Sequence, residues 1–159
     1  MKIRVGFGFD VHQLKEGEDF WLGGIHIPAQ KGILGHSDAD VLLHAICDAI
    51  LGSLALGDIG KHFPDTDQSF KGVDSKVLLE KVMELIAEKG YKIGNIDTTV
   101  VCQQPKIMPY ALQMQTCIAN ICNIEITDIS IKATTNETMG FIGREEGIVA
   151  YAVVLLLKK

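Results

Sequence analysis

Three residues in the first third of the chain have side chains and spacing that suit a metal ion: Asp10, His12 and His44. In an extended strand, side chains two positions apart point to the same face, so Asp10 and His12 present a carboxylate beside an imidazole. His44 ends the segment 35–44, which is typical of a loop entering a helix, and it is the obvious third ligand. Three such ligands leave a fourth zinc position open for a substrate oxygen, as a catalytic metal requires. The alternatives are a hydrogen-bonded surface pair at Asp10 and His12 and a core histidine at His44.

A strand and a helix must position these residues. Residues 2–12 alternate as a strand, in which Gly6 and Gly8 leave room for another backbone or a ligand. Residues 38–56 are predicted to form a helix, because their apolar side chains recur at spacings of three and four. Ser37 is the expected N-cap of this helix.

Two aspartates share the helical stripe of His44. The spacing of four places Asp40 and Asp48 on the same face as the histidine. A carboxylate there could orient the ring of a metal-bound histidine, or it could simply face solvent, and both interpretations stay open for Asp48.

Three further segments could face a phosphate group: His36-Ser37, Thr134-Thr135-Asn136-Glu137 and Gly143-Arg144. The first is expected at a helix N-terminus, which favours anions. The second combines hydroxyl and amide donors with a carboxylate that could bind a magnesium-like ion, and the third offers a guanidinium for phosphate. Helix capping, turn formation and surface solvation are the respective alternatives. Together with the metal ligands, the segments indicate a metal-assisted reaction at a phosphate group.

The rest of the chain predicts a single α+β domain over residues 1–159, a mixed sheet backed by helices in an α/β sandwich, with a small β-hairpin. Residues 20–28 read as the hairpin, turning at Gly23 and Gly24. Residues 57–67 are rich in helix- and strand-breaking types and are predicted to be a loop. The remaining predictions are helices at residues 75–89 and 110–122 and strands at residues 95–102, 129–133 and 148–157.

Composition excludes several classes of protein. The net charge of −5 and the lack of a Lys/Arg block argue against nucleic-acid binding. The longest apolar run, residues 148–157, is about half the length of a membrane-spanning helix. The four cysteines form no Cys-x-x-Cys pair and suit buried thiols of a reducing compartment. No secretory signal is visible at the start, so we expect a cytoplasmic protein.

Seven motifs in order resemble those of the 2-C-methyl-D-erythritol 2,4-cyclodiphosphate synthase family. The resemblance extends from about Ile3 to Leu157. The motifs are Gly8-Phe9-Asp10-Val11-His12, His36-Ser37-Asp38-Ala39-Asp40, Leu56-Gly57-Asp58-Ile59-Gly60, Phe63-Pro64-Asp65-Thr66-Asp67, Pro105-Lys106, Lys132-Ala133-Thr134-Thr135 and Gly143-Arg144-Glu145-Glu146-Gly147.

The resemblance implies a phosphorus–oxygen lyase of the non-mevalonate route to isoprenoid precursors. The expected reaction is the cyclisation of 4-diphosphocytidyl-2-C-methyl-D-erythritol 2-phosphate to 2-C-methyl-D-erythritol 2,4-cyclodiphosphate, with release of CMP. It implies zinc at Asp10, His12 and His44, and Mg²⁺ or Mn²⁺ at Glu137 as a second ion bridging the diphosphate. His36 and Thr135 match positions that stabilise the transition state.

The resemblance also implies a substrate site shared between the subunits of a homotrimer. Cys102, Gln104 and Asn136 lie where the family varies, so contacts there are expected through the backbone. The implied substrate-binding residues are Asp10, Val11, His12, His36, Ser37, Asp58, Ile59, Gly60, Phe63, Pro64, Asp65, Thr66, Asp67, Cys102, Gln103, Gln104, Pro105, Lys106, Ile107, Met108, Thr134, Thr135, Asn136, Glu137, Phe141 and Arg144.

Two functions from other classes remain open on the sequence. A zinc-dependent phosphohydrolase would use the same three ligands but consume water. A non-catalytic nucleotide-binding trimer would bind cytidine diphosphate compounds without turnover.

Overall fold

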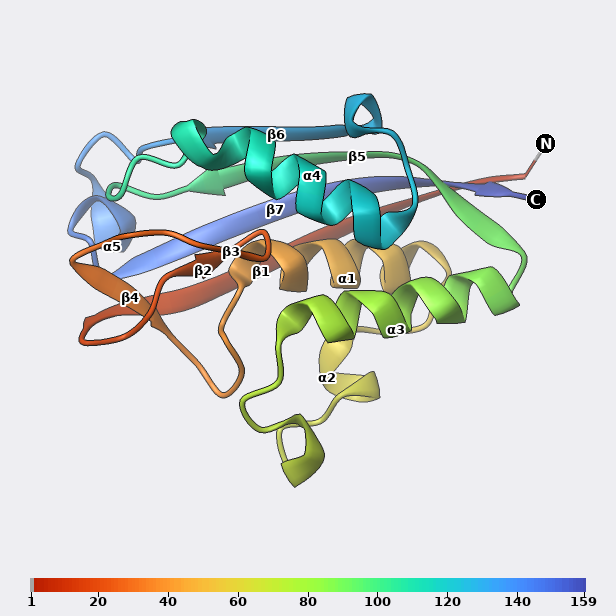
Figure 1. The fold of residues 1–159 in the computed structure, drawn as a ribbon, viewed down its shortest axis with the longest axis horizontal. Coiled ribbons are helices and arrows are strands. Elements are labelled where there is room, and N and C mark those ends of the chain that lie inside the picture. Colours follow the sequence, from red (N-terminus) through yellow and green to blue (C-terminus); the bar gives the residue numbers. More distant parts are fainter. Residues whose placement is uncertain (1) are drawn as a thin grey trace.

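Five strands form one sheet, and helices cover one of its two faces (Figure 1). The computed structural model describes residues 2–159. The order across the sheet is β4 (Lys31–Leu34), β1 (Ile3–Glu16), β7 (Gly147–Lys158), β5 (Tyr91–Val101) and β6 (Ile129–Thr134). Neighbouring strands are antiparallel except β5 and β6, which run parallel. The predicted α+β fold with a mixed sheet is therefore confirmed.

A two-stranded hairpin and a set of helices complete the fold. The hairpin consists of β2 (Trp21–Leu22) and β3 (Ile25–His26), as predicted. None of the helices in the described chain combines the length and hydropathy needed to cross a membrane. The helices are α1 (Val41–Ser53), α2 (Ile59–His62), α3 (Ser75–Glu88), α4 (Ala111–Cys122) and α5 (Gly140–Gly143), with 3₁₀ turns η1 (Gln68–Phe70), η2 (Met108–Tyr110) and η3 (Ile126–Asp128).

Helix α1 begins later than the sequence predicted, and its N-cap is Asp40 rather than Ser37. Ala39 has a φ of 56°, a left-handed conformation that a right-handed helix cannot include. The side chain of Asp40 accepts a hydrogen bond from the N–H of Leu43 at 3.0 Å. Ser37 instead accepts the N–H of Ala39 at 3.1 Å, so His36 and Ser37 lie in the preceding loop and not at the helix N-terminus.

The sequence also missed three short elements. Strand β4 has only four residues, too few to show an alternating pattern, and it pairs with the end of β1. Helices α2 and α5 each have four residues; α2 lies inside the segment predicted to be a loop, and no helix was predicted at α5. Such short elements are stabilised by tertiary contacts rather than by local sequence preference.

Helix α1 lies directly against β1 because two glycines omit the side chains that would separate them. A Cβ atom built on Gly6 would lie 1.8 Å from the carbonyl oxygen of Ala49. One built on Gly8 would lie 1.8 Å from the carbonyl oxygen of Ala45. This close approach places His44, the neighbour of Ala45, beside the strand that carries Asp10.

We expect Gly8→Ala to lower the free energy of unfolding by about 3 kcal/mol or more, because the added methyl group meets backbone that cannot move aside. Gly52→Ala in α1 is the control, since the added carbon would meet no atom within 4 Å beyond the backbone of its own helix. That substitution should stabilise the protein by up to about 1 kcal/mol. Chemical denaturation of both variants measures the difference, and equal stability of Gly8→Ala and wild type would contradict the packing argument.

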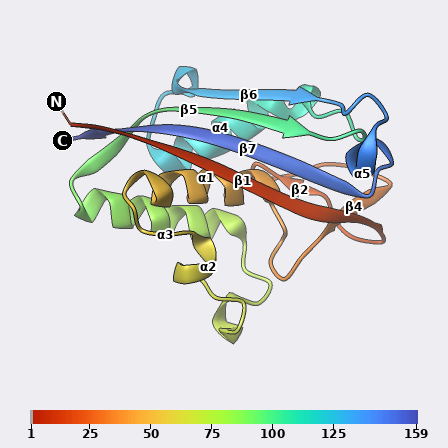
Figure 2. The same cartoon turned by 180° about the vertical axis from the view of Figure 1, so that it is seen from behind.

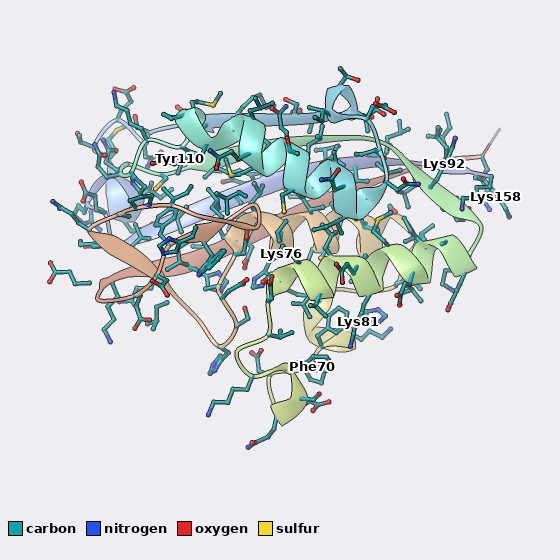
Figure 3. All side chains as sticks on the ribbon, in the orientation of Figure 1. Phe70, Lys76, Lys81, Lys92, Tyr110 and Lys158 are labelled. Atoms are coloured by element: carbon teal, nitrogen blue, oxygen red, sulfur yellow. The ribbon has the colours of Figure 1, made fainter. Side chains whose placement is uncertain are left out.

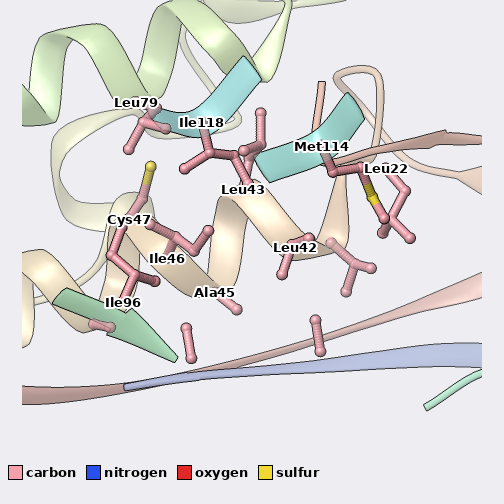
Figure 4. Close-up of a cluster of buried hydrophobic side chains, with 14 of the residues drawn as sticks. Leu22, Leu42, Leu43, Ala45, Ile46, Cys47, Leu79, Ile96, Met114 and Ile118 are labelled. Carbon is pink, nitrogen blue, oxygen red and sulfur yellow. The ribbon is translucent and has the colours of Figure 1, made fainter. Parts of the chain in front are cut away.

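The core surrounds α1 on several sides (Figure 4). Leu42, Leu43 and Ile46 of α1 are completely buried. They pack in one hydrophobic cluster with residues of α3, α4 and β5, including Leu79 and Ile96. Because such interiors are close-packed, α1 is a rigid support for His44.

Candidate active site

The structure brings Asp10, His12 and His44 together where the first turn of α1 meets β1. Oδ2 of Asp10 lies 3.0 Å from Nδ1 of His12 and 3.1 Å from Nδ1 of His44. The side chain of His44 is 9% exposed, whereas those of His12 and Asp10 are 20% and 22% exposed. The His44 side of the group is therefore buried, whereas the side formed by His12 and Asp10 is partly open to solvent.

The geometry of this group fits a tetrahedral metal ion. Nδ1 of His12 is buried, and its 3.0 Å contact with Oδ2 of Asp10 is not aligned as a hydrogen bond. Within residues 2–159 this nitrogen therefore has no hydrogen-bond partner, which costs free energy. Ligands at zinc–ligand distances of 2.0–2.1 Å in a tetrahedron lie roughly 3.3 Å apart, close to the two separations from Asp10. One potential ligand atom from each residue lies within 4.8 Å of the others. A metal ion would provide the unpaired nitrogen with a partner.

The charges in this group are coupled. Burial raises the pKa of Asp10, but the close contacts and charge interactions with His12 and His44 together outweigh it, so the pKa of this carboxyl lies below its ordinary value. Burial lowers the pKa of His44, but Asp10 outweighs that effect and brings the pKa above its usual range. The carboxylate is therefore ionised at neutral pH, as a metal ligand must be.

The two aspartates that share the stripe of His44 have structural partners. Asp40 is completely buried and accepts hydrogen bonds from the N–H groups of Gly23 at 2.9 Å and Gly24 at 2.7 Å. Burial raises the pKa of Asp40 in spite of these bonds. Asp48 accepts the N–H of Ile59 at 2.8 Å, and burial also raises its pKa. Asp40 thus anchors the β2–β3 hairpin to α1, and Asp48 anchors the start of α2.

A cavity of about 730 Å³ opens beside the metal-ligating group. Its walls come from the end of β1, the loop before α1, α2 and the loop that follows α2. Eleven residues implied by the resemblance line it: Asp10, Val11, His12, His36, Ser37, His44, Ile59, Gly60, Phe63, Asp65 and Thr66. Asp58, Pro64 and Asp67 do not line the cavity. Asp58 and Asp67 cap α2 and η1, accepting N–H groups of Lys61 at 3.0 Å and Ser69 at 2.9 Å.

Phe70 and Lys71 are among the lining residues that the sequence did not indicate. The ring of Phe70 packs edge-on against Phe63, with 5.4 Å between centroids. Nζ of Lys81 on α3 lies 5.1 Å from the Phe70 ring centroid (Figure 3). These contacts hold the 63–73 segment against α3, and no local pattern could have predicted them. The other lining residues missed are Gln13, Leu34, Gly35, Gln68, Val73 and Leu78.

The remaining implied residues form a second group at the same end of the sheet. Cys102 N–H donates to the Thr134 carbonyl at 3.0 Å, and Thr138 N–H donates to the Gln103 side chain at 3.3 Å. Loop 102–108 therefore lies beside loop 134–138. The sheet register aligns Val11 with Val149, Val149 with Val101, and Val101 with Thr134. Two strand spacings, roughly 10 Å, therefore separate β1 from β5, where loop 102–108 begins, and three, roughly 14 Å, separate β1 from β6.

Within a single chain, the structure thus does not bring this second group to the metal-ligating cavity. Gln104 and Pro105 instead border a smaller cavity of about 340 Å³. None of the group (Cys102, Gln103, Gln104, Pro105, Lys106, Ile107, Met108, Thr134, Thr135, Asn136, Glu137, Phe141 and Arg144) lines the larger one. Among residues 2–159, Asp10, His12 and His44 are the one group of three side chains that could together hold a metal ion, and Glu137 lies outside it.

Several side chains of the second group have local partners. The thiol of Cys102 donates to the Gln104 carbonyl, and burial raises the pKa of the thiol to about 12. The hydroxyl of Thr135 accepts the N–H of Glu137 at 3.3 Å. The guanidinium of Arg144 pairs with Glu146 at 3.0 Å on an exposed surface. Cys102 is therefore a neutral, structural thiol, whereas Thr135 and Arg144 remain accessible from outside.

Comparison with known proteins places the chain in a family. The YgbB family pattern matches residues 3–157. A 2-C-methyl-D-erythritol 2,4-cyclodiphosphate synthase from Bacteroides thetaiotaomicron is 60% identical over 99% of both chains. The solved CDP complex of IspF from Plasmodium falciparum is 38% identical, with a TM-score of 0.88 over 99% of this chain and 97% of that one.

A bifunctional protein has the same fold in one part. The structure of IspDF from Campylobacter jejuni superposes with a TM-score of 0.95 and 42% identity. The match covers 99% of this chain and 43% of that longer protein. The sequence match, the shared fold and the cavity with its three clustered ligands agree, and the chain belongs to the YgbB family.

Proposed function

We propose that this chain is a metal-dependent 2-C-methyl-D-erythritol 2,4-cyclodiphosphate synthase, a phosphorus–oxygen lyase. It converts 4-diphosphocytidyl-2-C-methyl-D-erythritol 2-phosphate to the cyclic diphosphate and CMP. The observation that carries the proposal is the group of Asp10, His12 and His44 at the edge of a large cavity, in a chain 60% identical to a protein of that name. Four free cysteines in the described chain support a reducing, cytoplasmic location.

The reaction needs alignment and charge neutralisation rather than an activated water. An oxygen of the 2-phosphate forms a bond to the β-phosphorus, while the bond from that phosphorus to the CMP oxygen breaks. Zinc held by Asp10, His12 and His44 would supply Lewis-acid stabilisation of the phosphate charge. His36 and Ser37 lie in the same cavity, where they would orient the methylerythritol phosphate. No side chain is required as a covalent nucleophile.

The nucleotide end of the substrate is assigned to the loops at 102–108 and 134–144. Lys106 and Arg144 supply positive charge for the diphosphate. Glu137 would hold a Mg²⁺ or Mn²⁺ ion, since hard oxygen ligands suit these ions, and such an ion would supply further positive charge for the diphosphate. The CDP complex of the Plasmodium falciparum relative supports a cytidine site in this fold.

The separation of the two groups supports a homotrimer with active sites between subunits. Each site would take its metal group from one chain and its cytidine loop from the next. Figure 2 shows the face of the sheet that carries no helices. In this view α4 lies on the far side of the strands, and α1 lies behind and below them. This face exposes alternate apolar side chains of β1 and β7, namely Ile3, Val5, Phe7, Phe9, Val11, Tyr151 and Val153. A contiguous apolar face of this kind is suited to association.

We expect Thr135→Val to lower kcat by about 10²–10³-fold with little change in KM, because a hydroxyl that stabilises only the transition state contributes little to ground-state binding. Steady-state kinetics on the purified variant measures both constants. Thr116→Val is the matched control, since its hydroxyl donates to the Leu112 carbonyl on an exposed face of α4. An unchanged kcat in Thr135→Val would assign Thr135 to the turn alone.

Product analysis tests the proposed function against its two alternatives. The purified protein is incubated with the CDP-methylerythritol phosphate substrate and Zn²⁺ plus Mg²⁺. A synthase releases CMP and the cyclic diphosphate, a phosphohydrolase consumes water and releases inorganic phosphate or an opened product, and a binding protein releases nothing. Either of the last two results would overturn the proposal.

A further inference from the structure

We propose that Asp38 and Ser75 are positioning residues that fix the tautomer and orientation of His44 for metal binding. The inference rests on the metal site of the proposed function and extends it to two residues that do not contact the metal. Ser75 is the first residue of α3 and is completely buried. Its hydroxyl oxygen lies 2.9 Å from Nε2 of His44. On its other side, the same hydroxyl is hydrogen-bonded to Oδ1 of Asp38.

The direction of this chain of hydrogen bonds follows from counting protons. A serine hydroxyl has a single proton to donate, and the carboxylate of Asp38 can only accept. The backbone N–H of Ser75 also donates to Asp38, to Oδ2 at 2.9 Å, and this second bond holds the carboxylate in place. The hydroxyl proton therefore goes to Asp38, and towards His44 the oxygen of Ser75 can only accept.

It follows that Nε2 of His44 carries a proton and donates it to Ser75. In a neutral imidazole, the other nitrogen is then an unprotonated acceptor. That nitrogen, Nδ1, is the one that faces Asp10 and His12. The Asp38–Ser75 pair thus presents a lone pair to the metal position, as a ligating histidine requires.

The Asp38–Ser75 pair acts against a second interaction, which favours the other tautomer of His44. Nδ1 of His44 lies 3.1 Å from the Asp10 carboxylate, which on its own favours a proton on Nδ1. A proton there would block ligation. The Ser75 hydroxyl, as an acceptor for Nε2–H, counteracts this preference. The hydroxyl of Ser37 is a second, weaker acceptor, 3.4 Å from Nε2. Loss of Ser75 should therefore impair metal binding without abolishing it.

The test is the zinc affinity of Ser75→Ala, measured by competition with a chromophoric chelator. We expect affinity to fall by about 10–100-fold, the usual effect of removing the outer partner of a ligating histidine. Ser53→Ala is the matched control, because Ser53 is also a buried serine but donates to the Ile50 carbonyl at 2.7 Å, outside the metal group. Its zinc affinity should equal that of wild type. Equal affinity in wild type and a folded Ser75→Ala protein would overturn the proposal.

A second measurement does not depend on metal binding. Long-range ¹H–¹⁵N NMR of the imidazoles reports the tautomer of His44 in metal-free protein at about pH 9, where imidazole is neutral. The Nε2–H form should predominate in wild type and decline in favour of Nδ1–H in Ser75→Ala. The same tautomer ratio in both proteins would overturn the proposal. If the tautomer ratio shifts in Ser75→Ala but wild type binds no zinc, the metal site of the proposed function would be refuted instead.

Discussion

Replacing His12 with alanine is expected to abolish stoichiometric zinc binding and to lower turnover by about a thousandfold. The substitution removes the ligand whose buried Nδ1 has no hydrogen-bond partner in the described chain. Charge stabilisation by a catalytic metal is worth several kcal/mol, and about 4 kcal/mol corresponds to roughly a thousandfold in rate. Metal content by elemental analysis and kcat by CMP release are the measurements. The fold should persist, because His12 is partly exposed and lies outside the hydrophobic cluster.

His26→Ala is the matched control for this prediction. His26 also pairs with an aspartate, Asp19, at 3.3 Å, but on the exposed hairpin away from the cavity. Its removal should leave zinc content and turnover unchanged. Full zinc occupancy in His12→Ala would show that Asp10, His12 and His44 are not the metal site.

Mixing two inactive variants is expected to restore about a quarter of wild-type activity. His44→Ala removes a metal ligand, and Lys106→Glu reverses a charge in the cytidine loop. If each site combines the metal group of one subunit with the loop of its neighbour, random trimers from equal amounts contain both intact parts in about one site in four. Activity after co-refolding, relative to wild type treated in the same way, measures this fraction.

The expected recovery depends on the separation seen within one chain. The register Val11–Val149–Val101 places two strand spacings between β1, which carries Asp10 and His12, and β5, from which the cytidine loop (residues 102–108) continues. Two variants refolded separately and then combined without exchange are the control, and they should stay inactive. Verified mixed trimers that recover no activity would place both parts of each site in one chain.

The metal group could be predicted from the sequence because the relative placement of two of its residues follows from the two-residue repeat of a strand alone. Asp10 and His12 share a face in any extended segment. His44 was within reach of inference because Gly6 and Gly8 indicated a close approach of another backbone, which proved to be that of α1. Here the local pattern and the tertiary packing agree.

Features that depend on contacts between distant segments could not be predicted. Asp40 shares a helical stripe with His44, yet it is buried against Gly23 and Gly24 of the hairpin. The start of α1 was misplaced because the left-handed conformation of Ala39 has no sequence signal. The role of Ser75 depends on the meeting of three segments, since it joins α3 to the loop before α1 and to α1 itself.

The most direct test of the central claim is to run the reaction in H₂¹⁸O and analyse both products by mass spectrometry. Cyclisation forms the new bond from an oxygen of the substrate's own 2-phosphate, so neither CMP nor the cyclic diphosphate should contain ¹⁸O. Unlabelled CMP and unlabelled cyclic diphosphate in equal amounts are the result that we predict. One ¹⁸O atom in a phosphate-containing product would show that water is the nucleophile, and the chain would then be a hydrolase.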